Sequence, residues 1–134
     1  FVSEMRNNPA GFIKVKQELN EKDQSFIDKF ERLVEDGYSE VEFQLSCVAK
    51  KIAMSDRQLQ RKLKAIMGLT FSEYVRSFRL KKSAKLLQEG LSIALLIEKV
   101  GFSSPSYFAS CFKAEFGETP KQFQHRAIAT QRDM

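Results

Sequence analysis

Apolar residues recur three and four positions apart through most of the chain, a spacing that places them on one face of an α-helix. The alternation of apolar and polar residues that marks a half-buried strand is missing. Capping residues and glycines delimit seven helices, expected at about 22–35, 43–53, 56–67, 71–89, 93–100, 106–116 and 120–127. The sequence therefore predicts an all-α fold, after a loosely ordered lead-in over residues 1–21.

Small polar residues and glycines set the predicted helix ends. Ser55, Thr70 and Ser104 can each accept a hydrogen bond from a free N–H group in the first turn of a helix. Gly68 and Gly117 suit the left-handed residue that follows a last turn. The inward faces are expected to include Leu59, Leu63, Ile66, Tyr74, Val75, Phe78, Phe108, Phe112 and Phe116. We expect the last residues of the chain to fray.

The pattern occurs twice. Residues 48–55 match residues 96–103 at a constant offset of 48 positions. At an offset of 49, Leu59, Leu63, Lys64, Gly68, Thr70 and Tyr74 match Phe108, Phe112, Lys113, Gly117, Thr119 and Phe123. Each copy is a short helix, a tight turn and a second helix with outward polar groups, which is the arrangement of a helix-turn-helix unit. A generic repeat of helical hairpins would give the same pattern.

Charge is distributed unevenly. Residues 1–44 contain 6 Lys and Arg against 10 Asp and Glu, whereas residues 45–126 contain 15 against 6. A basic segment of net charge +9 indicates a polyanionic partner, most simply nucleic acid. Charge alone leaves open a lysine-rich surface that only keeps the protein soluble.

Ordered motifs in both copies resemble the AraC/XylS family of bacterial transcription regulators. They lie between residues 26 and 126, and comprise 54–64, 68–76, Arg79-Leu80, 84–87, 100–102, 106–108, Phe112-Lys113 and 116–120. The resemblance implies a two-lobed DNA-binding domain within 22–134. Its first helix-turn-helix spans about 44–68, its linker helix 71–89, its second unit about 92–117, and its last helix 120–127.

The resemblance also implies partners. These are double-stranded DNA, RNA polymerase, and an upstream sensor, receiver or dimerisation region of the kind found in hybrid two-component proteins. The chain begins at Phe1 rather than Met, which we interpret as a piece of a longer protein. No run of ~18 to 20 apolar residues and no cleavable leader is present, so we expect a cytoplasmic, nucleoid-associated domain without membrane contact. A membrane anchor in a missing region stays open.

The helix over 56–67 is the stronger candidate for reading bases. Burial of Leu59 and Leu63 leaves polar side chains on the opposite face. Arginine pairs with guanine O6 and N7, and glutamine with adenine N6 and N7. We therefore expect Arg57, Gln60 and Arg61 to contact bases and Lys64, near the helix C-terminus, to contact phosphate.

The corresponding helix of the second copy has less chemical reach. Its exposed positions include Ser106, Ser110 and Lys113, where the family often has a basic residue at the position of Ser110. We expect Ser106 and Ser110 to face bases and Lys113 to contact phosphate, with shape contributing to recognition. Ser103 and Ser104 at the helix N-terminus are further phosphate candidates, because free amides there favour anions. Ile97 stands where many such units have alanine.

The helix over 71–89 separates the two units. Nineteen residues at ~1.5 Å each give ~28 Å, enough to place two reading helices about one DNA turn apart. On this helix we expect Arg76 to contact phosphate. The other cations, Arg79, Lys81, Lys82 and Lys85, are expected to be solvated surface charges.

Catalysis finds no support in the residue pattern. The one histidine, His125, is expected at the surface of the last helix, and neither Cys47 nor Cys111 has a partner at a motif spacing. Both thiols lie within apolar helical patterns, so we expect them reduced and packed in the core. We expect no enzyme activity, cofactor or metal. The alternative function is a helical protein-docking module that presents Phe26, Phe30, Leu33 and Val34.

Overall fold

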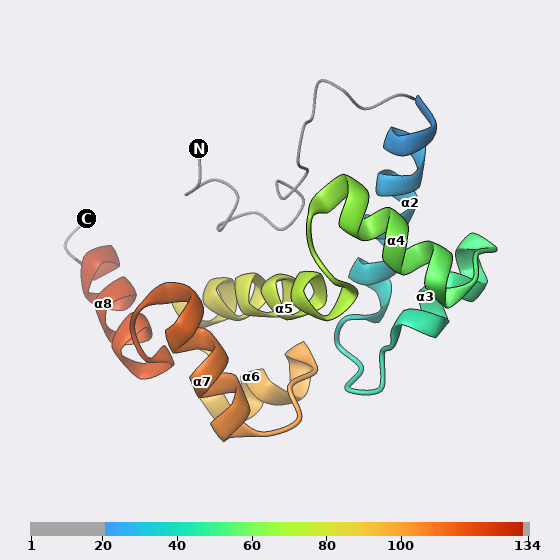
Figure 1. The fold of residues 1–134 in the computed structure, drawn as a ribbon. Helices are drawn as coiled ribbons and strands as arrows, with labels where there is room; N and C mark the ends of the chain where they lie inside the picture. Colours follow the sequence, from blue (N-terminus) through green and yellow to red (C-terminus); the bar gives the residue numbers. More distant parts are fainter. Residues whose placement is uncertain (1–20, 133–134) are drawn as a thin grey trace.

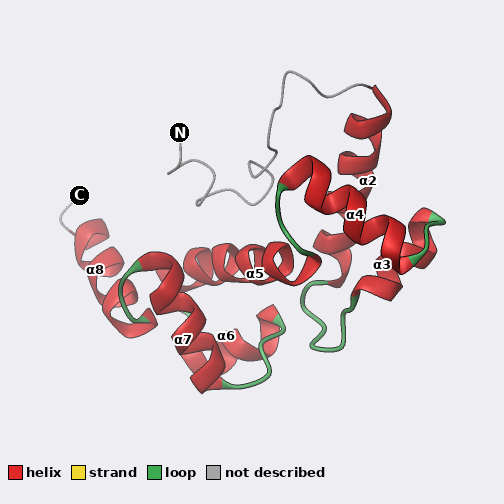
Figure 2. Ribbon diagram, viewed as in Figure 1, coloured by secondary structure: helices red, strands yellow, loops and turns green. Residues whose placement is uncertain are grey.

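The computed structural model describes residues 21–132, which form helices joined by short loops and contain no strand (Figures 1 and 2). The lead-in predicted for residues 1–21 falls almost wholly outside the described residues, whereas residues 128–132, which were expected to fray, continue the last helix. The helices are α2 (Glu21–Gly37), α3 (Leu45–Ile52), α4 (Asp56–Met67), α5 (Phe71–Gln88), α6 (Ile93–Val100), α7 (Pro105–Phe116) and α8 (Pro120–Arg132). The predicted all-α class with two helix-turn-helix units is confirmed.

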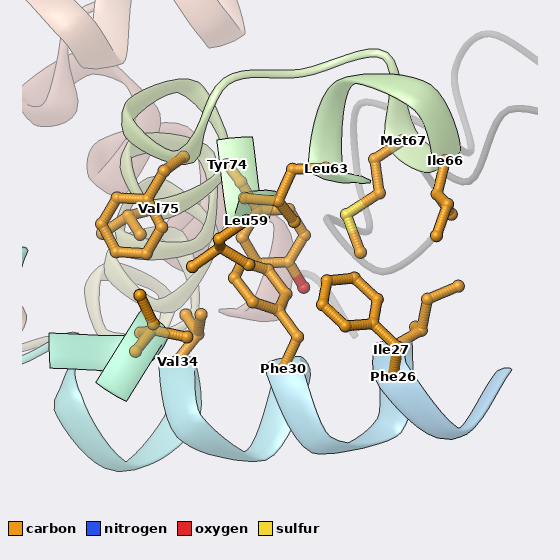
Figure 3. Packing of buried hydrophobic residues seen from close by; sticks show 13 residues of the cluster. Phe26, Ile27, Phe30, Val34, Leu59, Leu63, Ile66, Met67, Tyr74 and Val75 are labelled. Carbon is orange, nitrogen blue, oxygen red and sulfur yellow. The ribbon is translucent and has the colours of Figure 1, made fainter. Parts of the chain in front are cut away.

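Two hydrophobic cores divide these helices into two lobes that share α5 (Figure 1). In the first lobe, α2 lies beneath α4, and the start of α5 adds Tyr74 and Val75 (Figure 3). Its fully buried members include Ile27, Phe30, Val34, Leu59 and Leu63. In the second lobe, α6, α7 and α8 pack against the rest of α5 around Leu87, Leu96, Val100, Phe108 and Phe112.

Helix ends follow the predicted capping residues. Ser55 accepts from the Gln58 amide at 3.1 Å, and the Gln58 side chain accepts from the Ser55 amide, which closes a capping box on α4. Thr70 and Glu73 do the same for α5. The hydrogen bond from the Thr70 amide is the main cause that lowers the pKa of Glu73. The starts of both helices are therefore fixed by bonds within one turn.

Several helix boundaries differ from the prediction by one or two residues, and the end of α8 differs by five. Helix α3 begins at Leu45, because Phe43 instead packs its ring against Phe71, with 5.5 Å between the ring centroids. Helix α8 continues well beyond the predicted end at residue 127. Its Gln124 side chain donates to the carbonyl groups of Leu87 and Leu91, which hold α8 along the end of α5.

Four predicted side-chain environments are also wrong. Cys47 is exposed, because α3 buries the adjacent Val48 and Ala49, and Cys111 is only half-buried. Both thiols are free. Arg79 is half-buried rather than solvated, because it donates hydrogen bonds to backbone carbonyl groups outside its own helix. Lys82 is paired with Glu35 at 3.0 Å and is likewise not a freely solvated charge.

None of the helices between residues 21 and 132 combines the length and the apolar character needed to cross a bilayer. In the same residues, no group of three or more His, Cys, Asp and Glu side chains is placed to hold a metal ion. His125 is exposed on α8, as predicted.

Candidate nucleic-acid interface

Helix α4 presents one continuous polar face. Arg57, Gln60, Arg61 and Lys64 are all exposed, while Leu59 and Leu63 on the other side of the helix are buried in the first core. The predicted base-reading residues therefore share a face and are free of the packing that holds the helix. The Lys64 ammonium donates to the Gly68 carbonyl at 3.3 Å, so a phosphate contact would replace this hydrogen bond.

A groove of about 520 Å³ runs beside that face. It is lined from α4 by Gln60, Arg61 and Lys64 and, on the other side, by the starts of α3 and α5. Gln44 precedes α3 without a side-chain cap, so the first amides of α3 have no partner from that side chain. A helix N-terminus beside cations is suited to bind a phosphate.

Sequence reasoning missed two residues of this groove, Gln44 and Ser72. Both stand at helix starts, where an anion is favoured electrostatically. The position of Gln44 at the start of the first predicted helix-turn-helix was the available signal. Their proximity to Arg61, however, depends on how α3, α4 and α5 pack and is not visible in the sequence.

Helix α7 occupies the equivalent place in the second lobe. Ser106, Ser110 and Lys113 are exposed on it, and Ser103 is exposed just before it. The Ser104 hydroxyl accepts from the Tyr107 amide at 3.1 Å and caps the helix, so a phosphate would meet a side chain that already has a partner. These five predicted residues therefore lie on α7 or directly before it.

Tyr107 was not among the residues predicted for the interface. Its side chain is 47% exposed, although large aromatic residues are usually more buried. Its ring lies edge-on to Phe102, with 5.8 Å between centroids. The phenol is therefore held at the surface beside the start of α7, where it can contact a ligand with its ring and its hydroxyl.

A crevice of about 150 Å³ lies between the lobes and joins the two sets of residues. Arg76 and Arg79 line it from α5, and Tyr107 lines it from α7. The crevice shares Phe43, Phe71 and Ser72 with the groove beside α4. The polar face of α4, the start of α5 and the start of α7 thus border one continuous surface, and the predicted phosphate contact Arg76 lines the crevice between the lobes.

Comparison with known proteins identifies this arrangement. Residues 48–126, more than half of the chain, match a family described as a helix-turn-helix domain. The solved structure of an AraC-type DNA-binding domain-containing regulator from Chromobacterium violaceum has a TM-score of 0.73 and 28% identity. The match covers 81% of this chain and 96% of that one. The chain belongs to the AraC/XylS family of helix-turn-helix transcription regulators. The family is made up of DNA-binding transcription regulators.

Two further relatives place the AraC-type domain within signalling proteins. The C-terminal domain of the two-component response regulator yesN from Fusobacterium nucleatum is 30% identical, with a TM-score of 0.67, over 71% of this chain and 93% of that one. "Histidine kinase P4" from Formosa agariphila is 34% identical over 78% of this chain. The chain spans only 8% of the length of that kinase.

The docking alternative loses its main support in the structure. The apolar face of α2, including Phe26, Phe30 and Val34, is buried in the first core and offers no free surface. Leu33 is only partly buried at the edge of the same core.

Among the departures from the family pattern, Ile97 packs against the second core, which accommodates the larger side chain.

Proposed function

We propose that this AraC-type domain reads two successive major grooves on one face of double-stranded DNA, with α4 in one groove and α7 in the next. The observation that supports this reading is the continuous surface that runs from α4 past the start of α5 to the start of α7. Helix α5 separates the two units and spans ~27 Å at ~1.5 Å per residue, close to one turn of DNA.

In the first lobe, Arg57, Gln60 and Arg61 read bases, and Lys64 binds a phosphate. Two long guanidinium groups and an amide on one exposed face provide the bidentate pairs that distinguish guanine and adenine. Gln44, Ser72 and the first turn of α3 add a contact to the DNA backbone beside them. This lobe supplies most of the sequence preference.

In the second lobe, Ser106 and Ser110 meet base edges, and Ser103, Ser104 and Lys113 meet phosphates. Short hydroxyl side chains reach less far than arginine, so this lobe reads shape more than base identity. Arg76 binds the phosphates between the two grooves, because it lines the crevice between the lobes.

The domain acts within a larger regulator. The similarity to a response regulator and to a histidine kinase supports an upstream sensor or receiver region. RNA polymerase is the partner through which DNA binding would change transcription. Because chromosomal DNA is the target, the domain works at the nucleoid in the cytoplasm, and a membrane anchor, if any, belongs to another region of the protein.

Salt dependence tests DNA binding directly. We expect tight binding of a mixed-sequence duplex of about 25 base pairs at 50 mM salt. Affinity should fall by about 10³-fold or more at 200 mM salt, because about six or more phosphate contacts release counterions. Fluorescence anisotropy measures both values. A variant with Lys64→Ala and Arg76→Ala should show a shallower salt slope, whereas Lys22→Ala on α2 should not. No binding at either salt would contradict the proposal for this domain alone.

A further inference from the structure

The loop between α2 and α3 belongs to the first lobe and also contacts the linker helix α5 and the second lobe. Arg79, on α5, donates from Nε to the Tyr38 carbonyl at 2.8 Å and from Nη2 to the Glu40 carbonyl at 2.9 Å. Tyr38 packs against both hydrophobic cores. A single loop of the first lobe therefore meets the linker helix and the second lobe at one point.

The second lobe approaches the same carbonyl through Gly101. Gly101 ends α6 with φ of 79° and is buried. A Cβ at Gly101 would clash with the Tyr38 carbonyl oxygen and would lie 3.0 Å from Arg79 Nε. The absence of a side chain at Gly101 is therefore what allows the turn of the second unit to sit against the loop of the first lobe.

The environment of the guanidinium strengthens the contact. Burial lowers the pKa of Arg79, yet an arginine remains charged at physiological pH. A charged donor that is partly removed from water forms stronger hydrogen bonds to carbonyl oxygens than a solvated one. A second tether lies one turn further along α5, where Lys82 pairs with Glu35 and lies over the rings of Tyr38 and Phe78.

We propose that Arg79, the Tyr38 and Glu40 carbonyl groups and Gly101 form an inter-lobe brace that fixes the orientation of α7 relative to α4. Arg79 is in this view a positioning residue. It is held by the loop rather than by DNA, and it sets the spacing at which the two helices can enter a duplex. The part of the proposal that concerns DNA rests on the proposed function, whereas the part that concerns orientation does not.

A second glycine at a helix end of the same lobe supplies a control. Gly117 ends α7 with the same φ of 79°, but a Cβ there would meet nothing within 4 Å. Alanine at Gly101 or at Gly117 therefore imposes the same backbone strain, and only the former disturbs the brace. Lys85 provides the matching control for Arg79, since it is an exposed cation on the same helix.

The distance between the lobes can be measured without DNA. Spin labels at Ala65 on α4 and Ala114 on α7, both exposed, report it by pulsed electron paramagnetic resonance in a Cys47→Ser, Cys111→Ala background. We expect one narrow distance distribution for the parent protein, for Lys85→Met and for Gly117→Ala. We expect a broadened or shifted distribution for Arg79→Met and for Gly101→Ala.

Helix content measured by circular dichroism confirms that each variant is folded. Arg79→Lys, which keeps the charge and can reach one carbonyl, replaces Arg79→Met if the latter unfolds. Unchanged distributions in both brace variants would overturn the proposal. Broadening by Gly117→Ala equal to that by Gly101→Ala would also overturn it, because backbone strain would then explain the effect.

A second measurement connects the brace to DNA. An operator selected from a random library is compared with the same duplex carrying one extra base pair at its centre. When the lobes are rigid, affinity depends steeply on the spacing between the two binding sites on the duplex. Linked binding typically raises affinity by 10² to 10⁴, and loosened lobes lose about tenfold of this gain. We expect the ratio between the two duplexes to fall in Arg79→Met and to stay in Lys85→Met. If neither the parent protein nor any variant binds DNA, the proposed function is contradicted. The distance measurement alone then decides whether the brace exists.

Discussion

Ala53 and Gly101 occupy the same position in the two helix-turn-helix units, 48 residues apart, and both have left-handed backbone angles, with φ of 64° and 79°. Ala53 is exposed, whereas Gly101 is buried against the Tyr38 carbonyl and Arg79. The turn itself tolerates a methyl group in the first unit. The glycine in the second unit is therefore required by its neighbours as well as by the turn.

The exposed faces of the two units differ in a similar way. Helix α4 presents two arginines and a lysine, while α7 presents serines, one lysine and the exposed ring of Tyr107. Both helices are nevertheless held by the same device, in which a serine caps the first turn and large apolar side chains are buried behind it. The scaffold and the surface chemistry thus vary independently.

A third pair lies in the cores. Tyr74 on α5 matches Phe123 on α8 at the offset of 49, and both side chains are buried. The Tyr74 hydroxyl lies among the apolar side chains of the first lobe and makes no hydrogen bond within residues 21–132 (Figure 3). The second lobe has no such group at this position.

The largest expected effect is on the free energy of unfolding, and it differs between the glycines that end α6 and α7 in the second lobe. Gly101→Ala should lower the free energy of unfolding by about 2–5 kcal/mol, because left-handed strain adds to a steric clash. Gly117→Ala should cost only the strain, about 1–2 kcal/mol. Chemical denaturation monitored by circular dichroism measures both. Equal losses would mean that the packing around Gly101 relaxes without cost.

The next prediction separates the two reading helices. Arg57→Ala or Arg61→Ala should reduce discrimination at particular base pairs by about 1–3 kcal/mol, because each removes a bidentate contact. Ser106→Ala and Ser110→Ala should cost about 0.5–1.5 kcal/mol, because each loses one neutral hydrogen bond. Competition among operators with single base-pair changes measures these differences. Lys64→Ala is the control and should weaken binding evenly on all of them.

Tyr74→Phe makes the first core resemble the second. Burial raises the pKa of Tyr74 well above its ordinary value, so the folded state keeps the phenol neutral while the unfolded chain ionises above about pH 10. Stability should therefore fall above that pH by up to about 1.4 kcal/mol per pH unit in the parent. In Tyr74→Phe this contribution should vanish.

At neutral pH the same variant should be as stable as the parent or more stable by up to about 1 kcal/mol, since it loses an unpaired buried hydroxyl. Denaturation at pH 7 and at pH 11 measures both effects. A marked loss of stability at neutral pH would show that the hydroxyl has a partner in solution.

The smallest effect is expected in the first turn. Ala53→Gly removes the left-handed strain of a residue with a Cβ but increases the entropy of the unfolded chain. The two terms nearly cancel, so we expect a gain of about 0.5 kcal/mol in the free energy of unfolding. Thermal denaturation against the parent measures it. A loss would mean that the Ala53 methyl group makes a stabilising contact.

Most helix ends in this protein are determined by the sequence alone. Ser55, Thr70, Gly68 and Gly117 act on backbone groups within about one turn, so their effect is the same whatever the rest of the chain does. The repeat and the family motifs are visible for the same reason, because they depend on residues close together. The exposed faces of α4 and α7 follow from the apolar faces opposite to them.

Tertiary structure alone decided the roles of Arg79, Cys47 and Tyr107. The carbonyl groups that bury Arg79 lie 41 and 39 residues earlier in the chain, and its helix position by itself indicated a solvated charge. Gln44 and Ser72 likewise join the candidate interface only through the packing of α3, α4 and α5. Local patterns determine which face of a helix is apolar, whereas contacts between distant segments determine which polar residues are buried and which are brought together.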